Sequence, residues 1–326
     1  NWSYTVANDA PLADGSIAIT ATSIEASGRR QIKRTAIPVA SPGRTAHENR
    51  NKAAFAAVKD DGSVVSWGDS RYGGDSSSVA ADLSSGVNQI FSTRESFAAL
   101  KDDGSVVTWG SSDYGGDSSS VDLELSSGVN QIFSTGRAFA ALKDDGSVVT
   151  WGVDRDGGDS SSVDVELSSG VNQIFSTGTA FAALKDDGSV VSWGHSDRGG
   201  DSSSVATELS SGVNQIFSTG RAFAALKDDG SVVSWGLSGS GGDSNSVVGD
   251  QIFSNTPSVD LELSSGVNQI FSTNYAFAAV KDDGSVITWG HSTIGGDSSS
   301  VDLELSSGVN QIFSTDYAFA AVKDDG

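Results

Sequence analysis

One phrase recurs along most of this chain. Copies of "FAA[VL]KDDG" begin at phenylalanines that lie 42 residues apart, with a single interval of 54. A unit this short cannot bury both faces of its own sheet, so neighbouring copies must cover one another. The long interval holds a 12-residue insertion around "VVGDQIFSNTPS", which echoes the repeated "NQIFST". The repeated aromatic positions are Phe55, Phe97, Phe139, Phe181, Phe223, Phe277 and Phe319, with Trp67, Trp109, Trp151, Trp193, Trp235 and Trp289.

Each unit has the pattern of a small antiparallel sheet. "AFAALK" and "SVVTW" are short runs of β-forming residues, and the Asp-Gly between them is a strong hairpin signal. "VNQIFST" is a third predicted strand, and a short fourth is predicted near "VDLEL". We expect the Ala-rich strand to be the innermost one and the aromatic residues to fill the spaces between units.

Units of this length and strand content are typical of propeller blades. The predicted fold is therefore an all-β propeller with six full units plus a leading strand, which leaves closure with six or seven blades open. A linear β-solenoid is the alternative architecture. An unclosed array would leave an exposed sheet edge.

The unit resembles the regulator-of-chromosome-condensation type of repeat across residues 53–326. That resemblance implies a β-propeller, usually of seven blades. The segment Gly-Gln-Leu-Gly of that family is replaced here by "GGDSSS". The family's nucleotide-exchange activity depends on surface residues outside the repeat, so we do not expect it here. The matching positions include Asp145, Gly146, Val148, Trp151 and Gly152, followed by Val171, Ile174, Ala183, Leu184, Asp187 and Gly188.

The first 52 residues differ from the repeats. Residues 1–28 alternate as strands around "ADG" and resemble the closing strands of a bacterial immunoglobulin-like repeat. Residues 29–52 are basic and lack periodicity, so they are predicted to be a linker or an anomalous junction. The chain contains no methionine and stops inside the repeated hairpin, so we expect it to be part of a longer protein.

Charge is distributed unevenly. Of 20 Lys and Arg and 42 Asp and Glu, seven basic and four acidic residues lie in residues 1–52, which leaves 13 against 38 for the repeats. So negative a surface repels phosphate backbones and argues against nucleic-acid binding. Strong acidity also favours solubility in salty or extracellular surroundings. No run of apolar residues is long enough for membrane insertion.

The sequence carries no catalytic pattern. Almost every polar residue recurs in every repeat, and the chain has no cysteine and only His47, His195 and His291. No nucleophile elbow, phosphate loop or zinc-ligand spacing appears. The "DDG" tips and "GGDSSS" loops offer oxygen atoms that could hold calcium, but turn residues explain these aspartates better. We therefore predict no enzyme activity and no cofactor, with calcium as the one candidate ion.

Two short windows vary between units while their flanks hardly change. One follows Trp-Gly, as in "DSRY" and "HSDR", and the other precedes the Ala-rich strand, as in "GRA" and "NYA". Every arginine of residues 53–326 lies in a window, and Arg and Tyr often anchor binding interfaces. Drift in unconstrained loops is the alternative explanation. The predicted binding residues are Arg71, Tyr72, Arg94, Tyr114, Arg137, Arg155, His195, Arg198, Arg221, Tyr275, His291 and Tyr317.

These patterns predict a binding module that lacks catalysis. We expect a protein or a surface glycan as its partner, recognised through the variable loops on a secreted or cell-surface repeat protein. A structural spacer in a large surface protein is the second hypothesis. A propeller lyase or hydrolase is the third, because propellers host unrelated functions.

Overall fold

The computed structural model describes residues 3–5, 17–24, 30–37, 51–244 and 259–324. The chain divides into two compact units, Asn1–Pro42 and Gly43–Gly326. The insertion around "VVGDQIFSNTPS" lies outside the described residues. Within the described part of the chain, no helix is long and apolar enough to cross a membrane.

The first unit contains one antiparallel sheet. Its strands are β1 (Ser3–Thr5), β2 (Ile17–Ile24) and β3 (Arg30–Ile37), in that order. β2 and β3 pair over their full lengths, from Ile17↔Ile37 to Ile24↔Arg30. β3 therefore lies inside the stretch that the sequence predicted as a linker. The resemblance of this unit to an immunoglobulin-like module stays a prediction.

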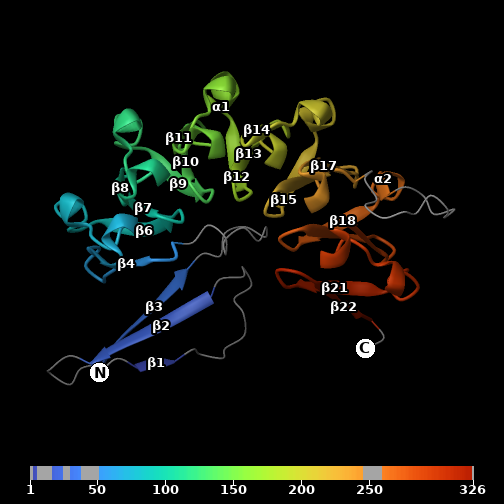
Figure 1. Ribbon diagram of the computed structural model, residues 1–326, viewed down its shortest axis with the longest axis horizontal. Coiled ribbons are helices and arrows are strands. Elements are labelled where there is room, and N and C mark those ends of the chain that lie inside the picture. The colour runs from blue at the N-terminus through green and yellow to red at the C-terminus, as the bar shows by residue number, and fades with distance from the viewer. Residues whose placement is uncertain (1–2, 6–16, 25–29, 38–50, 245–258, 325–326) are drawn as a thin grey trace. The chain divides into compact units, whose positions relative to one another are not determined.

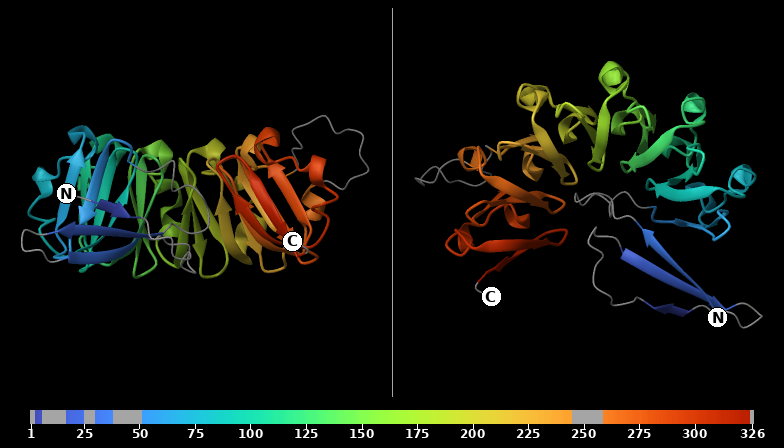
Figure 2. Two further views of the ribbon diagram at one scale, coloured as in Figure 1. Left: turned by 90° about the horizontal axis from the view of Figure 1, so that it is seen from below. Right: turned by 180° about the vertical axis from the view of Figure 1, so that it is seen from behind.

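The second unit is a series of antiparallel sheets that follow one another in chain order (Figure 1, Figure 2). Five have three strands and two have two. The sheets are β4 (Ala54–Val58) and β5 (Val64–Gly68); β6 (Val87–Ser92), β7 (Ser96–Lys101) and β8 (Val106–Gly110); β9 (Val129–Ser134), β10 (Ala138–Lys143) and β11 (Val148–Gly152); β12 (Val171–Ser176), β13 (Ala180–Lys185) and β14 (Val190–Gly194); β15 (Val213–Ser218), β16 (Ala222–Lys227) and β17 (Val232–Gly236); β18 (Val267–Ser272), β19 (Ala276–Lys281) and β20 (Val286–Gly290); and β21 (Val309–Ser314) and β22 (Phe319–Lys323).

The Asp-Gly hairpins form where the sequence predicts them. Between β10 and β11, the amide of Gly146 donates to the carbonyl of Lys143 over 3.0 Å. Gly146 has φ +76°, and a Cβ there would lie 2.8 Å from the backbone nitrogen of Gly170 in the next unit. Only glycine fits this turn, because it tolerates both the positive φ and the close approach. Asp145 accepts hydrogen bonds from the hydroxyl and amide of Ser147, and these bonds lower the pKa of its carboxyl group.

Each sheet packs face to face against the next. Between sheets β9–β11 and β12–β14, Ala140 and Leu142 of the first sheet form one cluster with Phe181 and Trp193 of the second. The rings of Phe181 and Trp193 stack with centroids 5.2 Å apart, and Trp193 is only 2% exposed. The indole Nε1 of Trp193 donates to the carbonyl of Gly157 over 3.1 Å. The prediction that the aromatic residues fill the spaces between units is confirmed.

The sequence prediction of the strand order within a unit was wrong. The Ala-rich strand is the middle strand of every three-stranded sheet, as in the order β9, β10, β11, and so it cannot be the innermost one. Its alanines are needed because neighbouring sheets cover both of its faces, and Ala182 and Ala183 are 0% exposed. Small side chains allow the sheets to approach from both sides.

The predicted fourth strand is helical. In the third unit, residues 161–163 form the 3-10 turn η7 (Ser161–Val163), and α1 (Asp164–Leu167) follows it directly. Val163 and Leu167 lie four residues apart, one helical turn, and both join the cluster between the sheets. The apolar spacing therefore suits a helical turn better than a strand, in which these two residues would need extended backbone between them.

The fold is an all-β propeller type built of antiparallel blades. A β-solenoid is excluded as a description of residues 51–244 and 259–324, because its strands would stack in parallel, whereas every described ladder is antiparallel. The outward faces of the first and last blades are exposed, with Phe55 at 61% and Phe313 at 54%. These two faces do not cover each other in the structure.

Candidate functional site

The two variable windows of each blade lie at the same end of its sheet. β10 begins where β11 ends, and Ala138 pairs with Gly152 there. The window before β10 and the window after β11 are therefore neighbours. We call the twelve windows together the variable rim. It consists of residues 69–72, 94–96, 111–114, 136–138, 153–156, 178–180, 195–198, 220–222, 237–240, 274–276, 291–294 and 316–318.

A buried threonine ties the two windows of a blade together. The hydroxyl of Thr135 donates to the carbonyl of Asp156 over 3.0 Å and accepts from the amide of Ala138 over 3.0 Å. The same contact recurs 21 residues apart in three other blades, as Thr93 to Tyr114, Thr177 to Arg198 and Thr219 to Ser240. Sequence reasoning missed these threonines because they are constant, although each stands immediately before a variable window.

A ladder of backbone hydrogen bonds joins the rim from blade to blade. The amide of Gly136 donates to the carbonyl of Gly178 over 2.9 Å, and the amide of Gly178 donates to Gly220 over 3.0 Å. The ladder runs from Arg94 through Gly136, Gly178, Gly220 and Asn274 to Asp316, with one bond of 2.9–3.1 Å at each step. The loops that carry the variable side chains are therefore held at fixed positions relative to one another.

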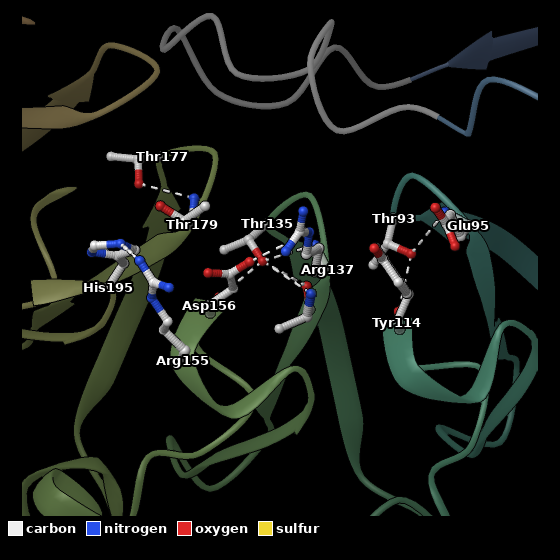
Figure 3. A network of polar contacts seen from close by, with 11 residues as sticks. Thr93, Glu95, Tyr114, Thr135, Arg137, Arg155, Asp156, Thr177, Thr179 and His195 are labelled. Atoms are coloured by element: carbon white, nitrogen blue, oxygen red, sulfur yellow. Dashed lines mark hydrogen bonds and ion pairs between the residues drawn. The ribbon is translucent and has the colours of Figure 1, made fainter.

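Arg137 bridges two blades on this rim (Figure 3). Its Cζ lies 5.4 Å from the ring centroid of Tyr114, which follows β8 of the preceding blade. Its Nε lies 3.6 Å from Oδ2 of Asp156, which follows β11. Asp156 is only 4% exposed, whereas the Arg137 side chain is 44% exposed. The guanidinium group is thus oriented by a carboxylate and an aromatic ring and still reaches solvent.

Arg155 and His195 form a second contact between blades. Nη2 of Arg155 lies against Nε2 of His195, and Nδ1 of that imidazole is buried without a hydrogen-bond partner. Burial lowers the pKa of His195, and the charges of Arg155 and Arg198 lower it further. The neutral ring then accepts from Arg155, which leaves the guanidinium group as the charged, exposed member of the pair.

Aromatic residues gather where the rim reaches the last two blades. Tyr275 and Tyr317 stack with centroids 6.2 Å apart and an interplanar angle of 13°. His291 meets Tyr275 edge-on at 6.2 Å, and Cζ of Arg221 lies 6.0 Å from the Tyr275 ring centroid. Tyr317 is 61% exposed, so this cluster offers solvent an aromatic surface beside a guanidinium group.

The other predicted residues are placed less centrally. Arg71 pairs with Asp69 over 2.7 Å and lies over the adjacent ring of Tyr72. Arg94 and Arg198 are half-buried. The structure thus joins eight of the predicted residues into clusters that span neighbouring blades and leaves Arg71 and Tyr72 as a local pair. Asp156, which the sequence analysis did not select, orients Arg137.

The rim presents charged, aromatic and hydroxyl side chains. Among residues 51–244 and 259–324, no group of three or more His, Cys, Asp or Glu side chains is arranged to hold a metal ion. A hollow of about 390 Å³ lies at the opposite end of the blades, between the hairpins of two neighbouring units. Lys185, Asp186 and Asn214 help to line it, and an equivalent hollow occurs one blade further on. Both consist of the constant turn residues.

Comparisons with known proteins assign no role to this chain. No family model and no curated protein matches this chain. Among solved structures, human WBSCR16 is 17% identical to this chain with a TM-score of 0.44, covering 100% of this chain and 94% of its own. Prp20p from Saccharomyces cerevisiae, studied with Gsp1p and histones, is 15% identical with a TM-score of 0.41, covering 85% and 76%.

The computationally designed Ika8 protein is also similar, at 12% identity and a TM-score of 0.37, covering 97% of this chain and 92% of its own. At such low identity and TM-score, none of these similarities carries over a partner or an activity. The repeated antiparallel sheets and their shared cores define the fold of this chain.

Proposed function

We propose that the variable rim binds another protein and that the propeller serves as the rigid support for it. The observation that carries this proposal is the combination of a constant backbone ladder with side chains that change from blade to blade. A rigid scaffold that presents varied loops is the usual arrangement of a recognition surface. Arg137 and Tyr317 are the side chains best placed to touch a partner, because both are exposed and both are held by a neighbouring ring.

The arginines of the rim favour a partner with acidic and aromatic groups. The repeat unit carries its lysines at the other end of the blade, as with Lys143 at the end of β10, whereas Arg137 precedes its start. A strand of six residues separates the two by roughly 20 Å. The rim holds all six arginines of residues 53–326 beside seven acidic residues, so it is close to neutral on a strongly acidic chain. The guanidinium group of Arg forms bidentate ion pairs with carboxylates and stacks on aromatic faces.

A surface glycan is the second candidate ligand. The observation that favours it is the exposed stack of Tyr275 and Tyr317, because flat aromatic faces can cover the apolar side of a sugar ring. We place the module on a secreted or cell-surface protein, on the grounds of its acidity and of the resemblance of residues 1–28 to an immunoglobulin-like repeat.

The test compares two variants of the full chain that lose the same charge in different places. Wild type and both variants are screened on arrays of extracellular proteins and of glycans. We expect the rim variant to lose at least about tenfold in affinity for the ligand found, and the control to bind like wild type. The rim variant is Arg137→Gln, Arg155→Gln and Arg221→Gln, and the control is Lys143→Gln, Lys185→Gln and Lys227→Gln.

These lysines make a suitable control. Each donates a hydrogen bond to a backbone carbonyl, as Lys143 does to Glu124 over 2.6 Å, and glutamine keeps a donor of similar kind. Equal loss by both variants would mean that only net charge matters, and the proposal would fail. Binding to neither array by folded wild type would favour the structural spacer.

A further inference from the structure

One place on the variable rim brings two arginines to a single histidine. Nη2 of Arg155, in the loop after β11, lies against Nε2 of His195, in the loop after β14 of the next blade (Figure 3). Arg198 belongs to the same loop as His195, and its amide donates to the carbonyl of His195 over 3.0 Å. No other pair of neighbouring units combines arginine and histidine at these three positions.

The two arginines lack acidic partners of their own. Arg137, which precedes β10, pairs with Asp156 over 3.6 Å. In the part of the chain that the structure describes, neither Arg155 nor Arg198 forms such an ion pair. Arg155 is exposed and Arg198 is half-buried, so solvent reaches both. Their N–H donors are therefore available to a carboxylate from outside the chain.

The charges of both arginines act on the imidazole. Burial lowers the pKa of His195 most, the charges of Arg155 and Arg198 lower it further, and the charges of Asp197 and Asp156 raise it by less. The imidazole is therefore neutral near pH 7 and accepts a hydrogen bond from Arg155. This contact orients the guanidinium group and uses only part of its hydrogen-bonding capacity.

Two buried polar atoms at this place have no hydrogen-bond partner. They are Nδ1 of His195 and Oγ1 of Thr179, two of the four such side-chain atoms among the described residues. The two residues adjoin, because the amide of His195 donates to the carbonyl of Thr179 over 3.0 Å. Buried polar groups without partners cost free energy, and native proteins keep such costs chiefly at functional sites. Stability alone therefore does not explain this arrangement.

From these observations we infer that Arg155 and Arg198 together bind a carboxylate group beside His195. The planar guanidinium group matches the two oxygens of a carboxylate, and hydrogen bonds between such charged groups are the strong ones. The carboxylate belongs to an Asp or Glu side chain of the partner protein. That last step rests on the proposed function, whereas the site itself does not.

The test is a titration of the full chain with acetate, followed by nuclear magnetic resonance of the histidine rings. The chain has three histidines, and His195→Gln identifies the signals of His195. Acetate replaces chloride at constant pH and ionic strength, so that only the kind of anion changes. The His195 signals are expected to move along a saturating curve. Bound acetate should also raise the pKa of His195, because its charge offsets the charges of the arginines.

Variants locate the site. Arg155→Gln and Arg198→Gln should each weaken acetate binding about tenfold, the usual effect of losing a hydrogen bond between charged groups. Lys185→Gln is the matched control, because it removes the same charge at the other end of the same blade, where Lys185 donates to the carbonyl of Glu166. It should bind acetate like wild type. Unmoved His195 signals in wild type overturn the inference without any variant, and so does equal weakening by Lys185→Gln.

Two further probes distinguish the sources of the carboxylate. The blocked peptide acetyl-Gly-Glu-Gly-amide represents a protein, and glucuronate represents a glycan. The peptide is expected to bind at least as tightly as acetate, and tighter binding of glucuronate would overturn the assignment to a protein. Acetate binding without a ligand on the protein arrays would support the site and refute the proposed function alone. A protein ligand that binds Arg155→Gln and Arg198→Gln as tightly as wild type would refute this inference alone.

Discussion

The tryptophans that repeat in every blade allow one sharp test of how the blades are stabilised. Trp193 and Trp67 occupy the same position in their units, but Trp193 is 2% exposed and Trp67 is 51% exposed. Each stacks on the phenylalanine of its own sheet, at 5.2 Å for Trp193 with Phe181 and 5.6 Å for Trp67 with Phe55. The same substitution at the two positions therefore isolates the contribution of the neighbouring blade.

Trp193→Ala should lower the free energy of unfolding by about 3–5 kcal/mol, the usual cost of emptying a buried aromatic site. Loss of the indole also leaves the carbonyl of Gly157 without its donor, which adds about 1–3 kcal/mol if no water replaces it. Trp67→Ala removes a ring that is already about half exposed, so about half as much apolar surface is returned to water and the loss of transfer free energy is about half as large. We expect a loss of about 2 kcal/mol or less at that position.

Urea unfolding followed by far-ultraviolet circular dichroism measures both losses. If the two substitutions cost the same, the packing between blades contributes little, and the stacked pair within each sheet accounts for the stability. That result would refute the view that each blade depends on its neighbour.

Two further predictions concern the turns and the rim. Gly146→Ala should destabilise the chain by more than about 1 kcal/mol in the same urea assay, because alanine disfavours φ +76° and its Cβ would meet the backbone of Gly170. Gly239→Ala is the matched control and should be tolerated, because a Cβ at Gly239 has nothing within 4 Å. Equal costs of the two substitutions would contradict the steric argument. For His195, a pKa lowered by burial and by neighbouring arginines means that the unfolded chain binds the proton more readily, so stability should be full above the ordinary pKa of about 6.5 and fall as pH drops below it. His195→Gln should flatten that part of a pH series of urea midpoints, and an unchanged slope would show that the imidazole is not the group responsible.

The repeated phrase was sufficient to predict the strands and the hairpins of each unit. "AFAALK" and "SVVTW" joined by Asp-Gly formed the predicted hairpin in every complete blade, because the turn chemistry and the β-forming residues act locally. The order of strands within a blade was not predicted correctly. Both Ala-rich and Ile- or Phe-containing strands are apolar, so the sequence does not say which strand is covered on both faces.

The clusters of the rim could be predicted only in part. Comparison of the units identified Arg137, Tyr114 and Tyr317 as variable, but it did not show which of them meet. Arg137 lies 23 residues from Tyr114 in the sequence, and only the packing of one blade against the next places its guanidinium group over that ring. The sequence did not identify Thr135 or Asp156 as rim residues of interest, because Thr135 is constant between units and Asp156 is one of many acidic residues.

The sequence by itself determined the local features of each unit, which are its length, its hairpin, its aromatic pair and the glycine at each tight turn. These features depend on residues that are close together in the chain. The tertiary structure decided everything that depends on one blade meeting another. Trp193 is 2% exposed and Trp67 is 51% exposed although their local sequences are nearly the same, because among the described residues a preceding blade covers only Trp193. The exposure of a side chain in a repeat therefore depends on the sheet that packs against it as well as on its own sequence.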